Sequence, residues 1–158
     1  MREHPDHYDA ELLLRLYDLR REAKLREARD WFMREFRVSS NEELEKRFLD
    51  HPEESPLFRM VLSYWDMAAS IVNHGLINEE FFFENTGEFW FVWMKVKHLA
   101  PQVREALKYP FAWKNLETLA DKFEKWRAAK APGSLDALRA RVLKLGKESA
   151  SSSAAKNS

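Results

Sequence analysis

The sequence predicts an all-α protein, an irregular bundle of about five to seven helices around a central hydrophobic helix at residues 56–74. The chain is rich in Leu, Ala, Glu, Lys and Arg, which favour helices. It has only four glycines and no sustained alternation of apolar and polar residues, which argues against a β fold. Helix-start signals also recur, beginning with Ser40-Asn41-Glu42-Glu43, which has the spacing of a capping box.

Composition sets limits on function. A chain of 158 residues fits one domain. Its 26 basic residues balance 26 acidic ones, so no overall field favours nucleic acid or an anionic membrane. The absence of cysteine excludes disulfides, thiol nucleophiles and thiolate metal sites. No cleavable leader is recognisable in the first residues, so we expect a cytoplasmic protein.

The first predicted helices follow from apolar spacing and capping residues. A stripe of Leu12, Leu16 and Leu19, continued by Trp31 and Phe32, predicts a helix over 8–36. The later segments begin at capping residues or at Pro56, and Pro101 should kink or divide the helix that contains it. The predicted helices are 8–36, 41–50, 56–74, 79–84, 87–108, 112–130 and 134–146.

One domain followed by a C-terminal segment is predicted. Residues 1–130 should form a single helical bundle. After the break at Ala131-Pro132-Gly133, residues 131–158 should form a short basic helix and a disordered tail rich in Ser and Ala.

The helix at 56–74 is apolar over most of its circumference, which is typical of a helix at the centre of a bundle. A narrow polar stripe interrupts this surface and comprises Arg59, Ser63, Asp66, Ser70 and Asn73. The stripe either meets water, which we favour, or lines a polar groove. If Asp66 is buried, it needs a partner such as Arg59 or a residue from another helix, and we expect a structural pair rather than a general base.

Residues 81–96 contain seven aromatic side chains. Polar residues 84–88 interrupt them, so the stretch is too short to cross a membrane. On a helix, Phe89, Val92 and Trp93 form a core face, and a second apolar face holds Trp90, Phe91 and Met94. We favour burial of the second face within the bundle. The alternatives are an interface with a second copy or an unknown protein partner, and, more weakly, a strand.

The segment SYWDMAASIVNHGLINEEFFF, residues 63–83, resembles the signature of a bacterial family of domains of unknown function. The similarity continues through Trp90, Trp93 and Pro101 and covers residues 28–128. It implies a helical fold and supplies no catalytic residues. Some members of the family carry an N-terminal membrane helix, and this sequence has no such segment.

No sequence motif indicates an enzyme, and we expect none. The sequence has no phosphate-binding glycine loop, no serine elbow and no recognisable metal motif, so no cofactor, metal ligand or catalytic residue is predicted. We expect a non-enzymatic module for protein interaction or scaffolding. The alternative is a sensor whose ligand pocket lies between 56–74 and 87–108, lined by Tyr64, Trp65, Trp90 and Trp93. Nucleic-acid binding through the basic C-terminal segment is a weaker third interpretation.

Overall fold

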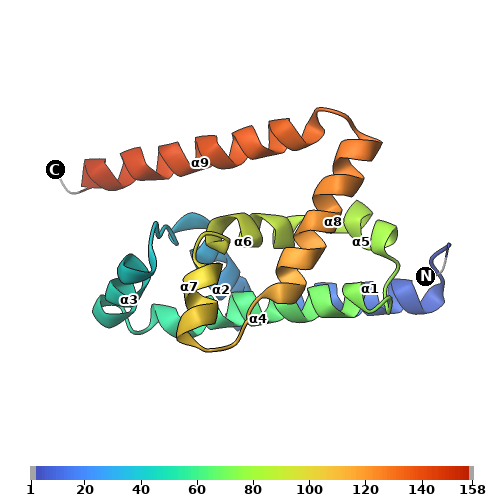
Figure 1. Ribbon diagram of the computed structural model, residues 1–158, viewed down its shortest axis with the longest axis horizontal. Helices are drawn as coiled ribbons and strands as arrows, with labels where there is room; N and C mark the ends of the chain where they lie inside the picture. The colour runs from blue at the N-terminus through green and yellow to red at the C-terminus, as the bar shows by residue number, and fades with distance from the viewer. Residues whose placement is uncertain (1–2, 157–158) are drawn as a thin grey trace.

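The computed structural model describes residues 3–156, and all the regular secondary structure in that range is helical (Figure 1). The all-α prediction is confirmed. The described chain has nine helices, more than the five to seven expected. They are α1 (His7–Arg20), α2 (Ala23–Arg34), α3 (Asn41–Asp50), α4 (Glu54–Asn73), α5 (Glu79–Asn85), α6 (Glu88–Val96), α7 (Ala100–Ala106), α8 (Lys114–Lys130) and α9 (Ser134–Lys156).

The higher helix number arises because two predicted helices each divide. The predicted helix 8–36 becomes α1 and α2, because the Glu22 side chain accepts hydrogen bonds from the backbone N–H groups of Lys24 and Leu25 and starts a new helix. The predicted helix 87–108 becomes α6 and α7. Pro101 lies in the first turn of α7, where its missing N–H costs least, so the predicted division at this proline is confirmed.

The last helix is longer than predicted. A helix over 134–146 and a disordered tail were expected, whereas α9 continues to Lys156. Alanine favours helix in this segment. The Nζ of Lys144 also lies 4.0 Å from Oε1 of Glu148, one turn later. The separation of a bundle domain ending at residue 130 stays a prediction.

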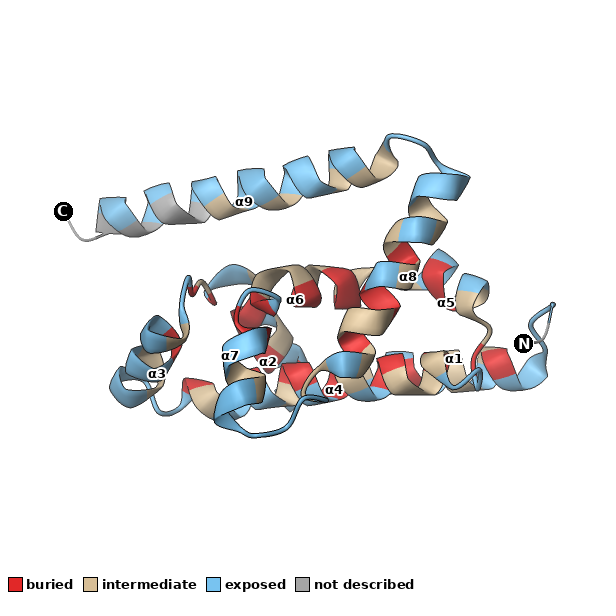
Figure 2. Ribbon diagram, viewed as in Figure 1, coloured by how far each residue is buried: buried red, intermediate tan, exposed pale blue. Residues whose placement is uncertain are grey.

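Helix α4 packs against α2 and α8 and also contacts α5 and α6 (Figures 1 and 2). Its apolar residues supply a large part of the core: Phe58, Val61, Leu62, Tyr64, Trp65, Ala68, Ala69 and Val72 are buried. Helix α8 crosses α4, and α9 runs along the side of α6 that faces away from α4 (Figure 1). Within the described residues, no helix is long and apolar enough to cross a membrane.

Candidate binding cleft

A pocket of about 550 Å³ lies between α3, α4, α7 and the loop 107–113, and we call it the α3–α4–α7 cleft. Most of its walls are apolar, with Leu44, Phe48, Phe58, Leu62, Val103, Ala106, Leu107, Tyr109, Ala112 and Trp113. The polar lining residues are Asn41, Glu45, Ser55, Arg59, Ser63 and Asp66. This volume lies within the range of roughly 300–1,000 Å³ typical of small-molecule sites.

The polar stripe of α4 forms one wall of this cleft. Arg59, Ser63 and Asp66 all line it, which corresponds to the groove alternative for the stripe. Arg59 and Ser63 are also exposed, so this edge of the wall is accessible to solvent. Ser70 lies one turn beyond Asp66, with its Oγ 3.4 Å from Nδ1 of His74. The stripe is therefore shared between the cleft and the helix end.

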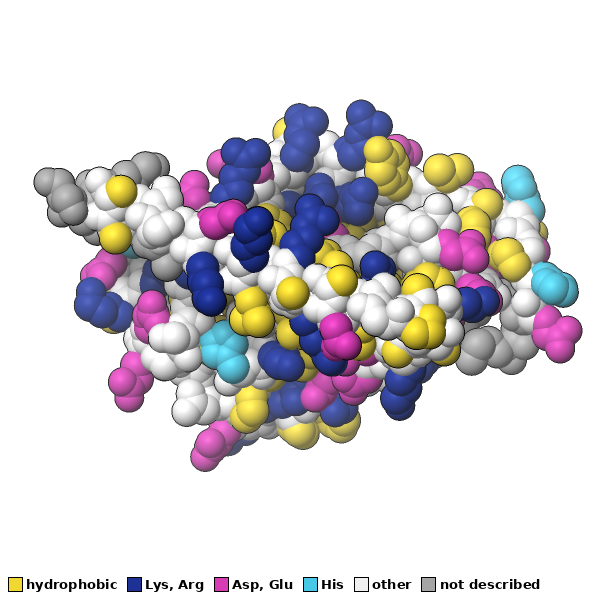
Figure 3. Space-filling view, turned by 90° about the horizontal axis from the view of Figure 1, so that it is seen from above, with side chains coloured by type: hydrophobic (Ala, Val, Ile, Leu, Met, Phe, Trp, Pro, Cys, Tyr) yellow, Lys and Arg dark blue, Asp and Glu magenta, His cyan; other side chains and the backbone are white. Residues whose placement is uncertain are grey.

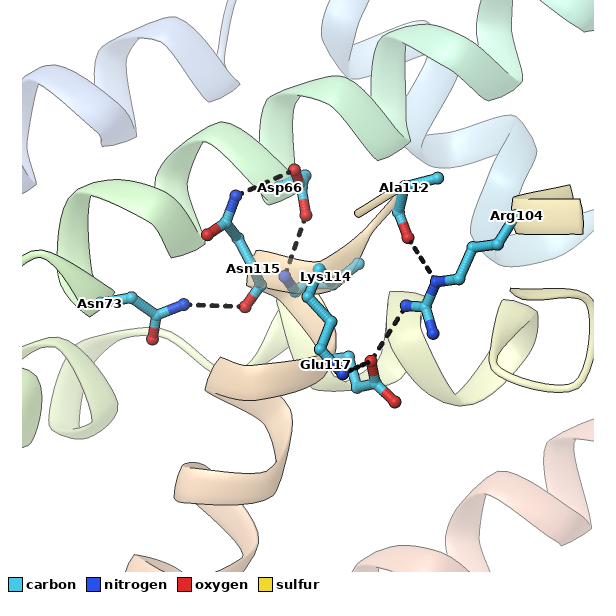
Figure 4. A network of polar contacts seen from close by, with 8 residues as sticks. Asp66, Asn73, Arg104, Ala112, Lys114, Asn115 and Glu117 are labelled. Atoms are coloured by element: carbon cyan, nitrogen blue, oxygen red, sulfur yellow. Dashed lines mark hydrogen bonds and ion pairs between the residues drawn. The ribbon is translucent and has the colours of Figure 1, made fainter. Parts of the chain in front are cut away.

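Asp66 caps a different helix from its own (Figure 4). Its Oδ1 accepts a hydrogen bond of 3.0 Å from the backbone N–H of Leu116, and its Oδ2 accepts one of 3.4 Å from Nδ2 of Asn115. Helix α8 has no side-chain cap of its own at Trp113. A carboxylate at a helix N-terminus satisfies free N–H groups and the positive end of the dipole. The expected structural partner from another helix is present, and it is the start of α8.

Further polar contacts fix the chain that leads into α8 (Figure 4). Arg104 of α7 donates to the carbonyl of Ala112 at 2.9 Å and to Glu117 at 3.0 Å, and Lys114 also donates to Glu117 at 2.8 Å. Burial alone would raise the pKa of Glu117, but the hydrogen bonds from Lys114 and Arg104 hold that pKa below its ordinary value. Asn73 adds a bond of 2.9 Å to the carbonyl of Asn115.

A second polar cluster holds α3 in place on the opposite side of the cleft. Glu54 of α4 accepts hydrogen bonds from Nε1 of Trp31 at 3.1 Å and from Nη2 of Arg47 at 3.0 Å. Burial would raise the pKa of Glu54, but these bonds from Arg47 and Trp31 keep the pKa below its usual value. These bonds join α2, α3 and α4 and fix the position of α3, which forms one wall of the cleft.

The loop 107–113 borders the cleft and is longer than the connection at 109–111 left between the predicted helices. Lys108 and Trp113 have positive φ angles of 51° and 57°, a left-handed conformation that is costly for side chains of this size. Leu107, Tyr109 and Phe111 are 64%, 54% and 63% exposed. The signal in the sequence was the proline of Tyr109-Pro110-Phe111, which lies between two predicted helices, because proline interrupts a regular helix.

The four residues predicted to line an aromatic pocket, Tyr64, Trp65, Trp90 and Trp93, do not line one pocket together. Tyr64 and Trp65 border a separate pocket of about 270 Å³, formed with α1 and residues 82–86. Burial raises the pKa of Tyr64 to about 12, and its hydroxyl donates to the carbonyl of Leu16. Trp93 is buried among the core residues, as is Trp90. The physical reason is that α6 turns both tryptophans inward, toward the core.

The second aromatic face of α6 is covered within the molecule. Trp90 is fully buried, and its Nε1 donates to Glu124 at 2.9 Å, so it lies in the core and not on a surface open to a partner. Phe91 and Met94 are partly buried against the core. Val142 and Leu145 of α9 border the same small pocket as Phe91. Trp90 is thus enclosed in the core and Phe91 lies beside α9, whereas Met94 borders a different pocket with Val38 and His98.

Lys95 is a buried titratable group that the sequence pattern did not single out. Its Nζ donates to the carbonyls of Phe32 and Met33 at the C-terminus of α2 and lies 5.0 Å from the centre of the Phe32 ring. Burial lowers the pKa of Lys95 to about 7, and repulsion from Arg37 and Arg47 adds to this effect. Lys95 is not among the residues that line the α3–α4–α7 cleft.

The cleft offers an apolar cavity and few groups suited to chemistry. Asp66 and Glu117 are engaged in the contacts that position α8. Across residues 3–156, no three His, Asp or Glu side chains lie close enough together to hold a metal ion. The arrangement is suited to binding an apolar molecule whose polar group reaches the α4 wall.

Comparison with known proteins gives one match. The family model described as "Domain of unknown function (DUF4760)" matches residues 7–126, which include the whole cleft and exclude α9. The match begins earlier than the resemblance over 28–128 and ends near the same place. No curated protein and no solved structure matches the chain.

Proposed function

Because the chain belongs to the DUF4760 family of domains of unknown function, whose description assigns no activity, we propose a function from the cleft: non-enzymatic binding of a small, largely apolar molecule. One observation carries the proposal. A cavity of about 550 Å³ with mostly apolar walls is left open beside a core that is otherwise filled with aromatic side chains. Apolar surface left exposed in a concave site commonly marks a binding site.

The contacts of the acidic side chains support a binding role rather than catalysis. A general base needs a carboxylate that can reach a substrate proton. Asp66, which lines the cleft, instead caps α8, and nearby Glu117 is bonded to Arg104 and Lys114. Glu45, the other carboxylate in the lining, is exposed to solvent like an ordinary surface carboxylate. The proposal therefore retains the expectation of a non-enzymatic protein.

The backbone at the mouth of the cleft also supports the proposal. Strained left-handed residues persist where the surrounding structure holds them, and they concentrate at functional sites. Here Lys108 and Trp113 flank the exposed Tyr109, which borders the cavity. The loop keeps aromatic side chains at the entrance instead of burying them in the core.

A fragment screen with a blocking variant tests the proposal. Apolar fragments would be screened against the full chain by ligand-observed NMR. Ala106 is exposed and lines the cleft, so Ala106→Trp should fill the cavity without disturbing the core. Ala137→Trp on α9 is the matched control, since Ala137 is also exposed but is not among the residues lining the cleft.

The expected result is a set of fragments that bind the wild type and Ala137→Trp and lose affinity for Ala106→Trp by at least about tenfold, or 1.4 kcal/mol. Circular dichroism would verify that all three chains are folded. If the fragments that bind do so equally to both variants, the cleft is not the binding site. If no fragment binds, the proposed function is contradicted.

A second candidate function is protein interaction, the first expectation from the sequence. Exposed Leu107, Tyr109 and Phe111 at the cleft mouth favour it, because aromatic residues are enriched at interface cores. A homodimer through this loop would appear in light scattering as a mass that rises with concentration. Phe111→Glu should abolish that rise, and a mass independent of concentration in the wild type would contradict the dimer.

The third candidate, nucleic-acid binding through the C-terminal segment, has weaker support. Lys and Arg side chains gather on the face that carries α9, but acidic and apolar side chains are interspersed among them (Figure 3). Arg139 is already paired with Glu124 at 2.9 Å. A salt-dependent shift of a labelled oligonucleotide would be needed to support this function.

A further inference from the structure

We propose that the molecule bound in the α3–α4–α7 cleft is an amphipathic carboxylate, with its apolar body in the cavity and its negative charge on Arg59. This inference rests on the proposed function and adds the chemical class of the ligand. It depends on how the charges that line the cleft are used by the protein.

Arg59 supplies the uncommitted positive charge. It lies on α4 and lines the cavity, and among the described residues no carboxylate lies within ion-pair distance of its guanidinium group. The other arginines near the cleft are engaged: Arg47 binds Glu54, and Arg104 binds Glu117. A guanidinium group presents paired N–H donors whose geometry matches a carboxylate.

Asp66 opposes the binding of a carboxylate less strongly than its formal charge suggests. Both of its oxygens accept hydrogen bonds from the first turn of α8, where the helix dipole favours a negative charge. The carboxylate is therefore partly neutralised by the protein itself. A ligand cation at that end would compete with α8 for Asp66, which disfavours a cationic ligand.

Glu45 is the other lining carboxylate and also opposes a bound carboxylate. It lies on α3 and is exposed. Exposed charges interact weakly because water and salt screen them. We therefore expect Glu45 to weaken the binding of an anion by a small factor only, and this effect can be measured.

The apolar part of the ligand has a clear location. Phe48, Phe58, Leu62 and Trp113 line the cavity, and Phe58 and Leu62 are buried core residues of α4. Ser63 and Arg59 lie on the same helix at the exposed edge. An amphipathic molecule can thus place its chain against Phe58 and Leu62 and its charged group at the rim, where the charge stays hydrated.

Three probes with the same alkyl chain separate the contribution of the chain to affinity from that of the charged group. Octanoate, octanol and octylammonium would be titrated into the full chain at pH 7.5, with calorimetry for affinity and amide NMR shifts for location. We expect all measurable binding to perturb the residues lining the cleft. Octanoate should bind roughly two- to fivefold more tightly than octanol, the range for an ion pair with an exposed arginine.

Matched variants assign the preference to Arg59. Arg59→Gln should reduce octanoate affinity to that of octanol and leave octanol unchanged. Arg141→Gln removes an exposed arginine from α9 and should change neither. Glu45→Gln should strengthen octanoate binding by about twofold, consistent with a screened charge.

The outcomes distinguish this inference from the proposed function. If octanol binds in the cleft and octanoate binds no more tightly, or if octylammonium binds best, the carboxylate inference is overturned while the binding function stands. The carboxylate inference is likewise overturned if Arg59→Gln keeps the preference for octanoate. If none of the probes perturbs the cleft, the proposed function itself fails, and the inference with it.

Discussion

The two sides of α4 show how one helix can serve two purposes. On one side, Trp65 and Val72 are buried in a continuous core, 2% exposed each. On the other side, Arg59 and Ser63 border an open cavity of about 550 Å³. The filled side and the open side lie on the same 20-residue helix, so the difference comes from what its neighbours supply.

The neighbours on the filled side supply buried aromatic side chains. Phe89 of α6 and Phe123 of α8 lie with ring centres 5.3 Å apart, and Phe89 also packs 6.4 Å from Trp65. On the open side, α3 and α7 each contribute one buried residue, Leu44 and Ala100, and Arg47 and Arg104 add polar contacts. Interiors are normally close-packed. The unfilled cavity therefore points to a function other than stability.

The largest expected effect comes from a pair of phenylalanines, one on each side of this comparison. Phe89→Ala should lower the free energy of unfolding by roughly 3–5 kcal/mol, because it removes a fully buried ring from the core. Phe111→Ala removes a 63% exposed ring and should change stability by less than about 0.5 kcal/mol. Urea denaturation measures both. Equal costs would mean that the loop is part of the core.

The next effect concerns the buried amine of Lys95 on the filled side. Its pKa is about 7 in the folded protein, against roughly 10.4 in an unfolded chain. The unfolded state therefore binds more protons between these values, so stability should rise with pH from about 7 to 10 and stay level below 7. The part of this interval from pH 7 to 9 should contribute roughly 1–3 kcal/mol.

The matched variants for this prediction are Lys95→Met and Lys97→Met. Lys95→Met should remove the rise with pH, and the exposed Lys97→Met should keep it. The measurement is urea denaturation at a series of pH values. A wild-type profile that falls from pH 7 to 9, or a rise that survives in Lys95→Met, would refute the assignment.

Asp66 connects the two sides, because it lines the cleft while capping a core helix. Asp66→Ala should cost about 1–2 kcal/mol, since it leaves the N-terminus of α8 without this cap. Asp18→Ala, at an exposed position of α1, should cost less than about 0.5 kcal/mol. Thermal or urea unfolding distinguishes them. A cost for Asp66→Ala no greater than for Asp18→Ala would show that the cap is unimportant.

The smallest expected effect is at the strained loop on the open side. Lys108→Gly should change stability by no more than about 1 kcal/mol, and the change should be a gain if relief of the positive φ exceeds the added entropy of the unfolded chain. Lys125→Gly, inside α8, should lose about 1 kcal/mol. If Lys108→Gly loses as much as Lys125→Gly, the left-handed residue carries no strain.

Local signals in the sequence predicted the helices better than their assembly. Ser40 and Asn78 cap α3 and α5 as their residue types indicated, because a cap is made within three residues. The break at Glu22 was missed, since a glutamate that accepts the first N–H groups of a new helix has no distinctive spacing. Each of these features is decided by neighbouring residues.

The cleft could be predicted only in part. The polar stripe on α4 was visible in the sequence, and a groove was one of its two interpretations. The partner of Asp66 lies 50 residues away, and the opposite walls come from α3 and α7. Such pairings depend on how distant helices pack, which a pattern along one helix does not contain. Burial of the face with Trp90 and Phe91 was the favoured prediction, but the sequence could not show that α8 and α9 lie beside it.

The most direct test of the division between a filled and an open side uses the six tryptophan indole signals of the full chain. Octanol would be titrated while the indole N–H resonances are followed by NMR. Trp113 lines the cleft, whereas Trp65 and Trp90 are buried in the core. A saturable shift of the Trp113 signal with Trp65 and Trp90 unmoved is the predicted result. An unmoved Trp113 signal, or shifts first at Trp65 and Trp90, would contradict the division.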